Sequence, residues 1–153
     1  MRIRTLLITF VTLLHSAVAI SGAWGVGPFE NDDALDFALQ LQEYDSYQAI
    51  WLPFGEIIRS DSYIDATIGA QAIAAAGVVA ALRGKPRPTL PEDLAKWVES
   101  KNWSGDVKLV GTAEMCLKKV LDPARSELAQ LWQDSDQYEA WRAAGEELLK
   151  DLR

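Results

Sequence analysis

The pattern of apolar positions predicts helices along most of the chain, organised around one stretch that is apolar on every side. Residues 66–82, ATIGAQAIAAAGVVAAL, carry no charge, and their only polar side chains are Thr67 and Gln71. Alanine is the best helix former, so a helix is expected here. A helix that is apolar all round lies either in a protein core or in a membrane. Seventeen residues with small side chains stand at the lower limit of a membrane span, so we predict a buried central helix with a smooth stripe of small residues. The residues of this stripe are Gly69, Ala72, Ala76 and Ala80.

The other segments place apolar residues at helical spacing, and helix-capping residues or turn residues separate them. The residues placed to begin helices are Asn31, Ser46, the pair Ser62 and Asp65, Ser126, and the pair Asp136 and Glu139. Gly84 is placed to end the central helix, and Pro53 should kink or break the helix over residues 47–59 near its middle.

The sequence therefore predicts an all-α fold, a compact bundle of six to seven helices around the buried alanine-rich helix. No segment shows the alternating pattern of a strand. The predicted segments are 32–43, 47–59, 66–82, a shorter helix from Thr89 or Leu90, 106–121, 126–132 and 138–152.

The first nineteen residues have the pattern of a signal peptide. Arg2 and Arg4 precede the apolar run Leu6–Leu14, and Ala17-Val18-Ala19 fits the small-x-small cleavage pattern. We expect cleavage after Ala19, a single helical domain over residues 20–153, and a periplasmic or secreted protein. The alternative is an uncleaved membrane anchor, for which the apolar run is short.

Charge and residue usage exclude several kinds of chemistry. The formal net charge is -7 and no basic run forms a patch, so nucleic acid is not an expected partner. The only histidine, His15, would leave with the signal peptide, which removes the commonest general base and metal ligand. Cys116 is the only cysteine, so no disulfide within the chain is expected, and we interpret it as a small core residue. No cofactor, metal ligand or catalytic residue is predicted.

A glycine-rich opening precedes the first predicted helix. In GAWGVGPFENDDALD, residues 22–36, we expect Trp24 and Phe29 to anchor the segment in the core. Asn31 can cap the helix, and Asp32 and Asp33 place negative charge where the helix dipole favours it.

This opening carries a resemblance to a known family. GAWGVGPFENDDALDF resembles the start of the bacterial family known as domain of unknown function 4259. The family pattern continues with an alanine-rich helix ending at Ala80-Ala81-Leu82, Leu90-Pro91, Ser126-Glu127-Leu128, Leu131-Trp132 and a C-terminal amphipathic helix with a tryptophan. The resemblance covers Gly22 to the C-terminus and implies no activity and no catalytic residue. Family members often begin at the glycine-tryptophan motif, so an exported N-terminus is a departure from the pattern.

The densest set of oxygen ligands lies in this motif and forms most of the candidate functional surface. A calcium site requires such oxygens to converge, but the spacing of a calcium-binding loop is missing, and we expect capping and dipole roles instead. The turn around Trp103 is the other candidate, since that ring is the least certain to be core. The candidate surface consists of Glu30, Asn31, Asp32, Asp33, Asp36 and Trp103.

Two functions remain open from the sequence. The first is a small, exported, non-enzymatic protein that binds a protein or a ligand, in one form an immunity or inhibitor protein, with no stable membrane insertion. The alternative is a carboxylate-dependent enzyme acting on envelope carbohydrate, in which paired carboxyls and exposed tryptophans would do the work. Glu114 is the carboxyl nearest an apolar helical face, but no partner stands at a defined spacing from it.

Overall fold

A computed structural model describes residues 22–60, 63–85 and 89–153. Within these ranges the all-α prediction is confirmed, and strand pairing is limited to two isolated bridges. The predicted signal peptide, residues 1–19, lies outside the described residues. The helices are α1 (Asp32–Tyr44), η1 (Tyr47–Ile50, a 3-10 helix), α2 (Trp51–Arg59), α3 (Ala66–Leu82), α4 (Glu92–Glu99), α5 (Val107–Val120), α6 (Glu127–Gln133) and α7 (Tyr138–Asp151).

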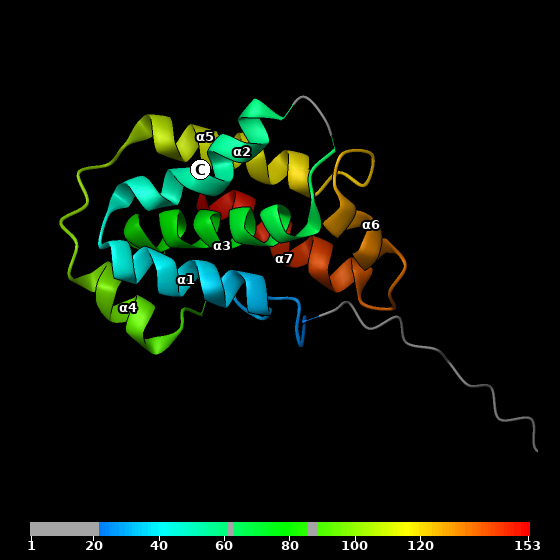
Figure 1. The fold of residues 1–153 in the computed structure, drawn as a ribbon, viewed down its shortest axis with the longest axis horizontal. Helices are drawn as coiled ribbons and strands as arrows, with labels where there is room; N and C mark the ends of the chain where they lie inside the picture. Colours follow the sequence, from blue (N-terminus) through cyan, green and yellow to red (C-terminus); the bar gives the residue numbers. More distant parts are fainter. Residues whose placement is uncertain (1–21, 61–62, 86–88) are drawn as a thin grey trace, which may run out of the picture.

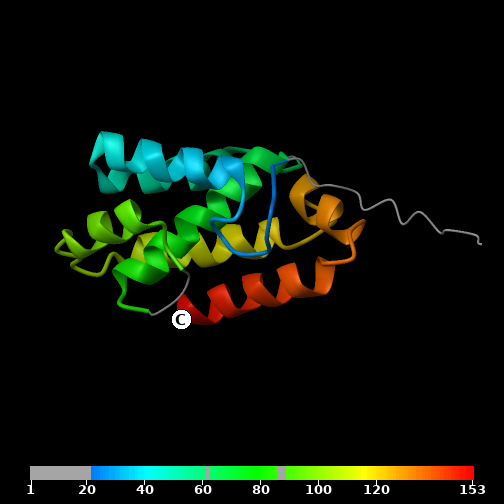
Figure 2. The ribbon, with the colours of Figure 1, turned by 90° about the horizontal axis from the view of Figure 1, so that it is seen from below.

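Helix α3 is the centre of the bundle, as predicted (Figure 1). All the other helices of the described chain contact it, and Figure 2 shows α1 and α7 on opposite sides of it. Among the described residues, no helix combines the length and the apolar character that crossing a membrane requires. The apolar surface of α3 is instead covered by its neighbours, because nearly every side chain from Gly69 to Leu82 is buried.

The small residues of α3 allow this close packing. All four members of the predicted stripe are buried. A Cβ atom placed on Gly69 would lie 3.3 Å from the Cβ of Leu128 and 3.5 Å from a methyl group of Val120. The absence of a side chain at Gly69 therefore lets α5 and α6 approach the backbone of α3.

The structure confirms three of the predicted caps, adds Asp106, and makes Asp65, predicted as the second member of a capping box, the cap itself. The side chains of Asn31, Ser46 and Ser126 accept hydrogen bonds from the backbone N–H groups of Ala34, Gln48 and Ala129. Asp106 caps α5 in the same way, and Asp65 caps α3. Ser62, predicted to share a capping box with Asp65, lies outside the described residues. Gly84 ends α3 with a φ of 75°, as expected of a glycine at this position.

The capping box predicted at Asp136 and Glu139 is wrong. Gln137 precedes α7, and its side chain makes no capping bond. Ser135 organises this connection instead, since its hydroxyl donates to the carbonyl of Trp132 and accepts from the N–H of Gln137. The Ser135 side chain therefore caps the end of α6 and fixes the turn that leads to α7.

Proline shapes two helix boundaries. As predicted, the segment 47–59 is interrupted: it is divided into η1 and α2, and Pro53 is the third residue of α2, where the backbone N–H has no partner within the helix in any case. Helix α4 begins at Glu92 rather than at Thr89 or Leu90. Leu90 precedes Pro91, and a residue before proline is driven out of the helical conformation.

Close packing against α3 gives a testable expectation. Gly69→Leu should lower the free energy of unfolding by about 1–3 kcal/mol, because the new side chain would overpack the contact with Leu128. The matched control is Gly111→Leu on α5, where a Cβ atom would meet nothing within 4 Å. The control should leave stability unchanged or raise it by about 0.5–1 kcal/mol through helix propensity. Urea unfolding of both variants makes the measurement, and equal effects would contradict this account of α3.

Candidate functional site

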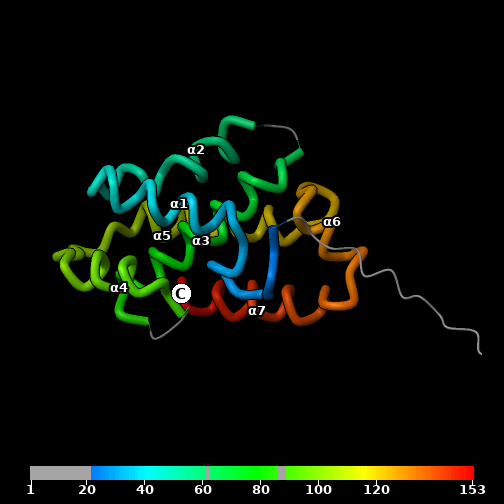
Figure 3. Tube along the Cα trace, turned by 60° about the horizontal axis from the view of Figure 1, so that its bottom comes forward, coloured from blue at the N-terminus to red at the C-terminus, as the bar shows by residue number. Residues whose placement is uncertain are grey.

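The opening motif forms a closed loop, which we call the motif loop, residues 22–31. An isolated antiparallel bridge pairs Ala23 with Asn31, the N–H of Trp24 donates to the carbonyl of Glu30 at 3.1 Å, and that of Asp32 to Gly22 at 3.1 Å. Gly22 has a φ of 78°, which favours glycine. The loop thus folds back on the start of α1, and Figures 2 and 3 show it beside α7.

Glu30 holds the inside of this loop together. Its carboxylate accepts a hydrogen bond of 2.7 Å from the N–H of Gly27. A Cβ atom on Gly25 would lie 2.1 Å from the same carboxylate oxygen, and one on Gly27 would lie 2.9 Å from it. The two glycines therefore make room for the Glu30 side chain, which serves the loop itself.

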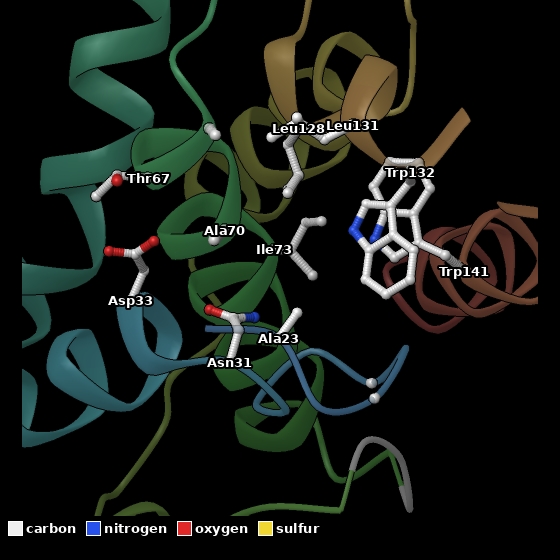
Figure 4. A pocket seen from close by; sticks show the side chains of 13 residues that line it. Ala23, Asn31, Asp33, Thr67, Ala70, Ile73, Leu128, Leu131, Trp132 and Trp141 are labelled. Atoms are coloured by element: carbon white, nitrogen blue, oxygen red, sulfur yellow. The ribbon is translucent and has the colours of Figure 1, made fainter. Parts of the chain in front are cut away.

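The predicted Trp24 anchor is wrong, and Phe29 alone anchors the loop. Phe29 is 5% exposed and belongs to the core, whereas Trp24 is 58% exposed. Successive residues of an extended segment point to opposite sides. Ala23 points inward, into a pocket beside the loop (Figure 4), so Trp24 points outward.

The oxygen-bearing residues of the motif diverge rather than converge. Asn31 caps α1 with a bond of 2.8 Å to the N–H of Ala34, and Asp32 and Asp36 are exposed on α1. In the described part of the chain, no group of three or more acidic, histidine or cysteine residues is placed to hold a metal ion. Asp33 is different from its neighbours because it faces the pocket.

This pocket, which we call the motif pocket, is a cavity of about 240 Å³ between the motif loop and helices α1, α3, α6 and α7 (Figure 4). A parallel bridge of Ile64 with Ser126 and a 3.0 Å bond from the N–H of Ala66 to Glu127 hold the starts of α3 and α6 together beside it. The lining residues are Ala23, Gly25, Gly27, Asn31, Asp33, Ala66, Thr67, Ala70, Ile73, Leu128, Leu131, Trp132 and Trp141.

Two tryptophans form one wall of the motif pocket. The rings of Trp132 and Trp141 stack with their centroids 5.8 Å apart and their planes at 11°. Figure 4 shows the nitrogen edges of both rings turned toward Ile73. Neither indole N–H donates to an acceptor among the described residues, and neither nitrogen is among the described buried polar atoms that lack a partner, so both N–H groups are accessible from the pocket.

The opposite wall carries a carboxylate. Figure 4 shows Asp33 and Thr67 across from the two indoles, with Ala70 and Ile73 between them. Asp33 is half-buried, and its carboxylate has no hydrogen bond or ion pair with another side chain of the described chain. Both walls therefore offer polar groups that the described protein leaves without partners.

Trp103, the remaining predicted site residue, lies in a different hollow. It packs against Tyr47 with ring centroids 5.7 Å apart and lines an open groove between the end of α3, the start of α5 and the C-terminus. In this groove Arg83 binds the carbonyl oxygen of Leu152. The structure thus separates Trp103 from the motif residues.

The carboxyl considered for catalysis is held in its charged form. Hydrogen bonds from Lys118 and then Arg153 lower the pKa of Glu114, and the ion-pair distances are 2.7 and 3.1 Å. A general acid in a glycosidase needs the opposite shift. Among the described residues that line the motif pocket, Asp33 is the one carboxylate, so a facing pair is lacking there.

Comparison with known sequences settles the relationship suggested by the opening motif. The family model described as Domain of unknown function (DUF4259) matches residues 22–144. The chain belongs to this family. The match begins at the first residue of the motif loop and includes every residue that lines the motif pocket. Searches of curated proteins and of solved structures found no match.

The pocket-forming role of Trp132 and Trp141 could not be found from the DUF4259 sequence. Both residues stand at core spacing, and both are buried as expected. The orientation of the two ring edges depends on how α6 and α7 meet at the loop of Ser135, which no sequence pattern reports. The one sequence feature that points to these two tryptophans is that Leu131-Trp132 and Trp141 belong to the family pattern.

The different surroundings of Phe29 and Trp24 predict different mutational costs. Phe29→Ala should lower the free energy of unfolding by about 3–5 kcal/mol, as for other buried aromatic residues. Trp24→Ala should change it by no more than about 0.5 kcal/mol, because the ring is mostly exposed. Urea unfolding measures both values. A loss for Trp24→Ala as large as that for Phe29→Ala would show that Trp24 is an anchor after all.

Cys116 should behave as an inert core thiol. Its sulfur lies 3.9 Å from the carbonyl oxygen of Phe54, and burial raises the pKa of the thiol to about 11. The thiolate is the reactive form, so little of it is present at pH 8. A thiol-specific disulfide reagent at pH 8 should label unfolded protein within minutes and native protein only at the rate of unfolding. Rapid labelling of the native protein would contradict this assignment.

Proposed function

We propose that this protein is a small, exported, non-enzymatic binding protein and that the motif pocket takes a small ligand. The observation that carries the proposal is the pair of indole N–H groups facing the Asp33 carboxylate across one cavity, with no side-chain partner for either wall in the described chain. The described buried polar atoms that lack a partner belong to Tyr47 and Asp151, so the two indole N–H groups are accessible from the cavity. A ligand in the pocket would supply a hydrogen-bond partner to both walls.

The composition of the pocket is typical of a binding site. Apolar side chains from α3, α6 and α7 line part of its surface, and polar groups line nearly as much of it. Binding pockets combine such an apolar lining with a small number of oriented polar groups. The motif loop closes one side of this pocket through Ala23, Gly25 and Gly27, so the family's opening motif has a direct part in the site.

The alternative, a carboxylate-dependent enzyme acting on envelope carbohydrate, has less support. Hydrolysis of a glycosidic bond needs two carboxyl groups on either side of the bond. Asp33 provides one carboxyl group in the motif pocket. The ion pairs of Glu114 stabilise the ionised form of Glu114, which is the wrong form for a general acid.

Export rests on the predicted signal peptide alone, and recovery of a chain beginning near Ile20 from outside the cytoplasm would support it.

Filling the pocket tests the proposed function. Thr67→Phe places a ring at the rim of the motif pocket, and Val107→Phe, the matched control, places one in the Trp103 groove. A panel of small amines, amides, amino acids and sugars is tested by thermal unfolding and by indole fluorescence. At least one compound should stabilise the wild type, by about 2.7 kcal/mol at one hundred times its Kd.

The two variants separate the outcomes. The stabilising compound should act equally on Val107→Phe and lose its effect on Thr67→Phe. Its binding should also change the fluorescence of wild-type protein, because Trp132 and Trp141 line the cavity. Stabilisation of Thr67→Phe to the wild-type extent, or no response to any compound, would overturn the proposal.

A further inference from the structure

We propose that the motif pocket selects a small aliphatic ammonium compound whose far end carries an uncharged hydrogen-bond acceptor, such as an amide carbonyl. This inference rests on the proposed binding function and names the ligand class of the same site. It follows from the donors on one wall, the acceptor on the other, and the charge and size of the space between them.

The tryptophan wall specifies an acceptor. The stacked rings of Trp132 and Trp141 are nearly parallel, and their N–H edges point the same way (Figure 4). An indole N–H only donates, whereas a carbonyl oxygen has two lone pairs and can accept from two donors. A carbonyl group against this wall therefore offers an acceptor to the indole donors.

The Asp33 wall specifies a cation. The carboxylate is half-buried, lines the cavity and has no charged or hydrogen-bonding side-chain partner among the described residues. Hydrogen bonds between an ammonium group and a carboxylate are stronger than neutral ones. The hydroxyl of Thr67 lies on the same wall and offers a further acceptor.

The charge of the lining decides between related ligands. No lysine or arginine is among the described lining residues, so Asp33 leaves the pocket with negative charge. A ligand carboxylate at the indole wall would have no cation to neutralise it and would be desolvated at a cost. A second ammonium group there would face two N–H donors and find no acceptor. A single positive charge with a neutral acceptor is the combination that satisfies both walls.

The middle of the pocket sets the body and the size of the ligand. Ala70, Ile73 and Leu128 line it with apolar atoms, which favours a short carbon chain. A cavity of about 240 Å³ lies below the range of drug-sized sites and suits a small ligand, such as a short aliphatic ω-amino amide.

The test compares four ligand types on the purified wild-type protein by calorimetric titration. The probe series is the ω-amino amides from glycinamide to 5-aminopentanamide, and the comparison compounds are 5-aminopentanoate, 1,5-diaminopentane and pentanamide. At least one amino amide should bind at least tenfold more tightly than each comparison compound. Binding of pentanamide or of 5-aminopentanoate as tight as that of the best amino amide would overturn the inference.

Two sets of variants assign the ends of the ligand. Asp33→Asn should weaken the best amino amide at least tenfold and leave the much weaker pentanamide unchanged, because only the cation site is lost. Asp32→Asn is the matched control: it removes the same charge from the same helical turn, at an exposed residue outside the pocket, and should leave both affinities unchanged. Equal losses in the two aspartate variants would overturn the cation site.

Trp141→Phe and Trp132→Phe keep a ring but remove an N–H, and each should weaken the amino amide severalfold. Neither should change the affinity for 1,5-diaminopentane, which has no acceptor for the indoles. Loss of affinity for both compounds would overturn the carbonyl assignment.

The wider panel separates this inference from the proposed function. If no amino amide binds, but another compound of the panel binds and Thr67→Phe abolishes that binding, this inference fails and the proposed function stands. If nothing in the panel binds, both fail.

Discussion

The close packing of every other helix onto α3 is the constraint on which the rest of the structure depends. Helix α3 is buried along most of its length but contributes few large side chains, so its neighbours must supply the bulk of the core. The largest fully buried side chains accordingly come from other helices, with Leu41 on α1, Phe54 on α2 and Leu109 on α5. This arrangement works because alanine and glycine let those side chains reach the backbone of α3, and each contact then buries apolar surface on both partners.

The same constraint explains where the pocket lies. Ala66, Ala70 and Ile73 follow one another at intervals of four and three residues and therefore share one face of α3. The short side chains of Ala66 and Ala70 leave space, and the neighbours on this face close around it without filling it. Where a glycine meets a leucine directly, as at Gly69 and Leu128, no space remains. The cavity thus occurs on the face of α3 that is covered by the motif loop, Leu128, Leu131 and two flat rings.

Much of the fold could be predicted from the sequence, because helix type and helix ends depend on local chemistry. The apolar character of residues 66–82 identified α3, and the caps at Asn31, Ser46 and Ser126 follow from side chains that bond to their own helix. Two of the errors have non-local causes. Trp24 is exposed because the pairing of Ala23 with Asn31 sets which side of the loop faces inward. The pocket itself escaped prediction because it requires the relative placement of α1, α3, α6 and α7, and each of its side chains taken alone is an ordinary core or cap residue.

The first turn of α1 shows how the fold separates residues that the sequence presents as equivalent. Asp32 and Asp33 are adjacent, acidic and equally suited to the helix dipole. Successive residues of a helix are rotated by about 100°, since one turn takes 3.6 residues. The Asn31 cap and the bond from Asp32 to Gly22 set where that rotation starts, so Asp32 stays outside against Gly22 while Asp33 faces the cavity. The motif loop therefore has two effects: it begins α1 at a defined residue, and by doing so it places one carboxylate in the wall of the motif pocket.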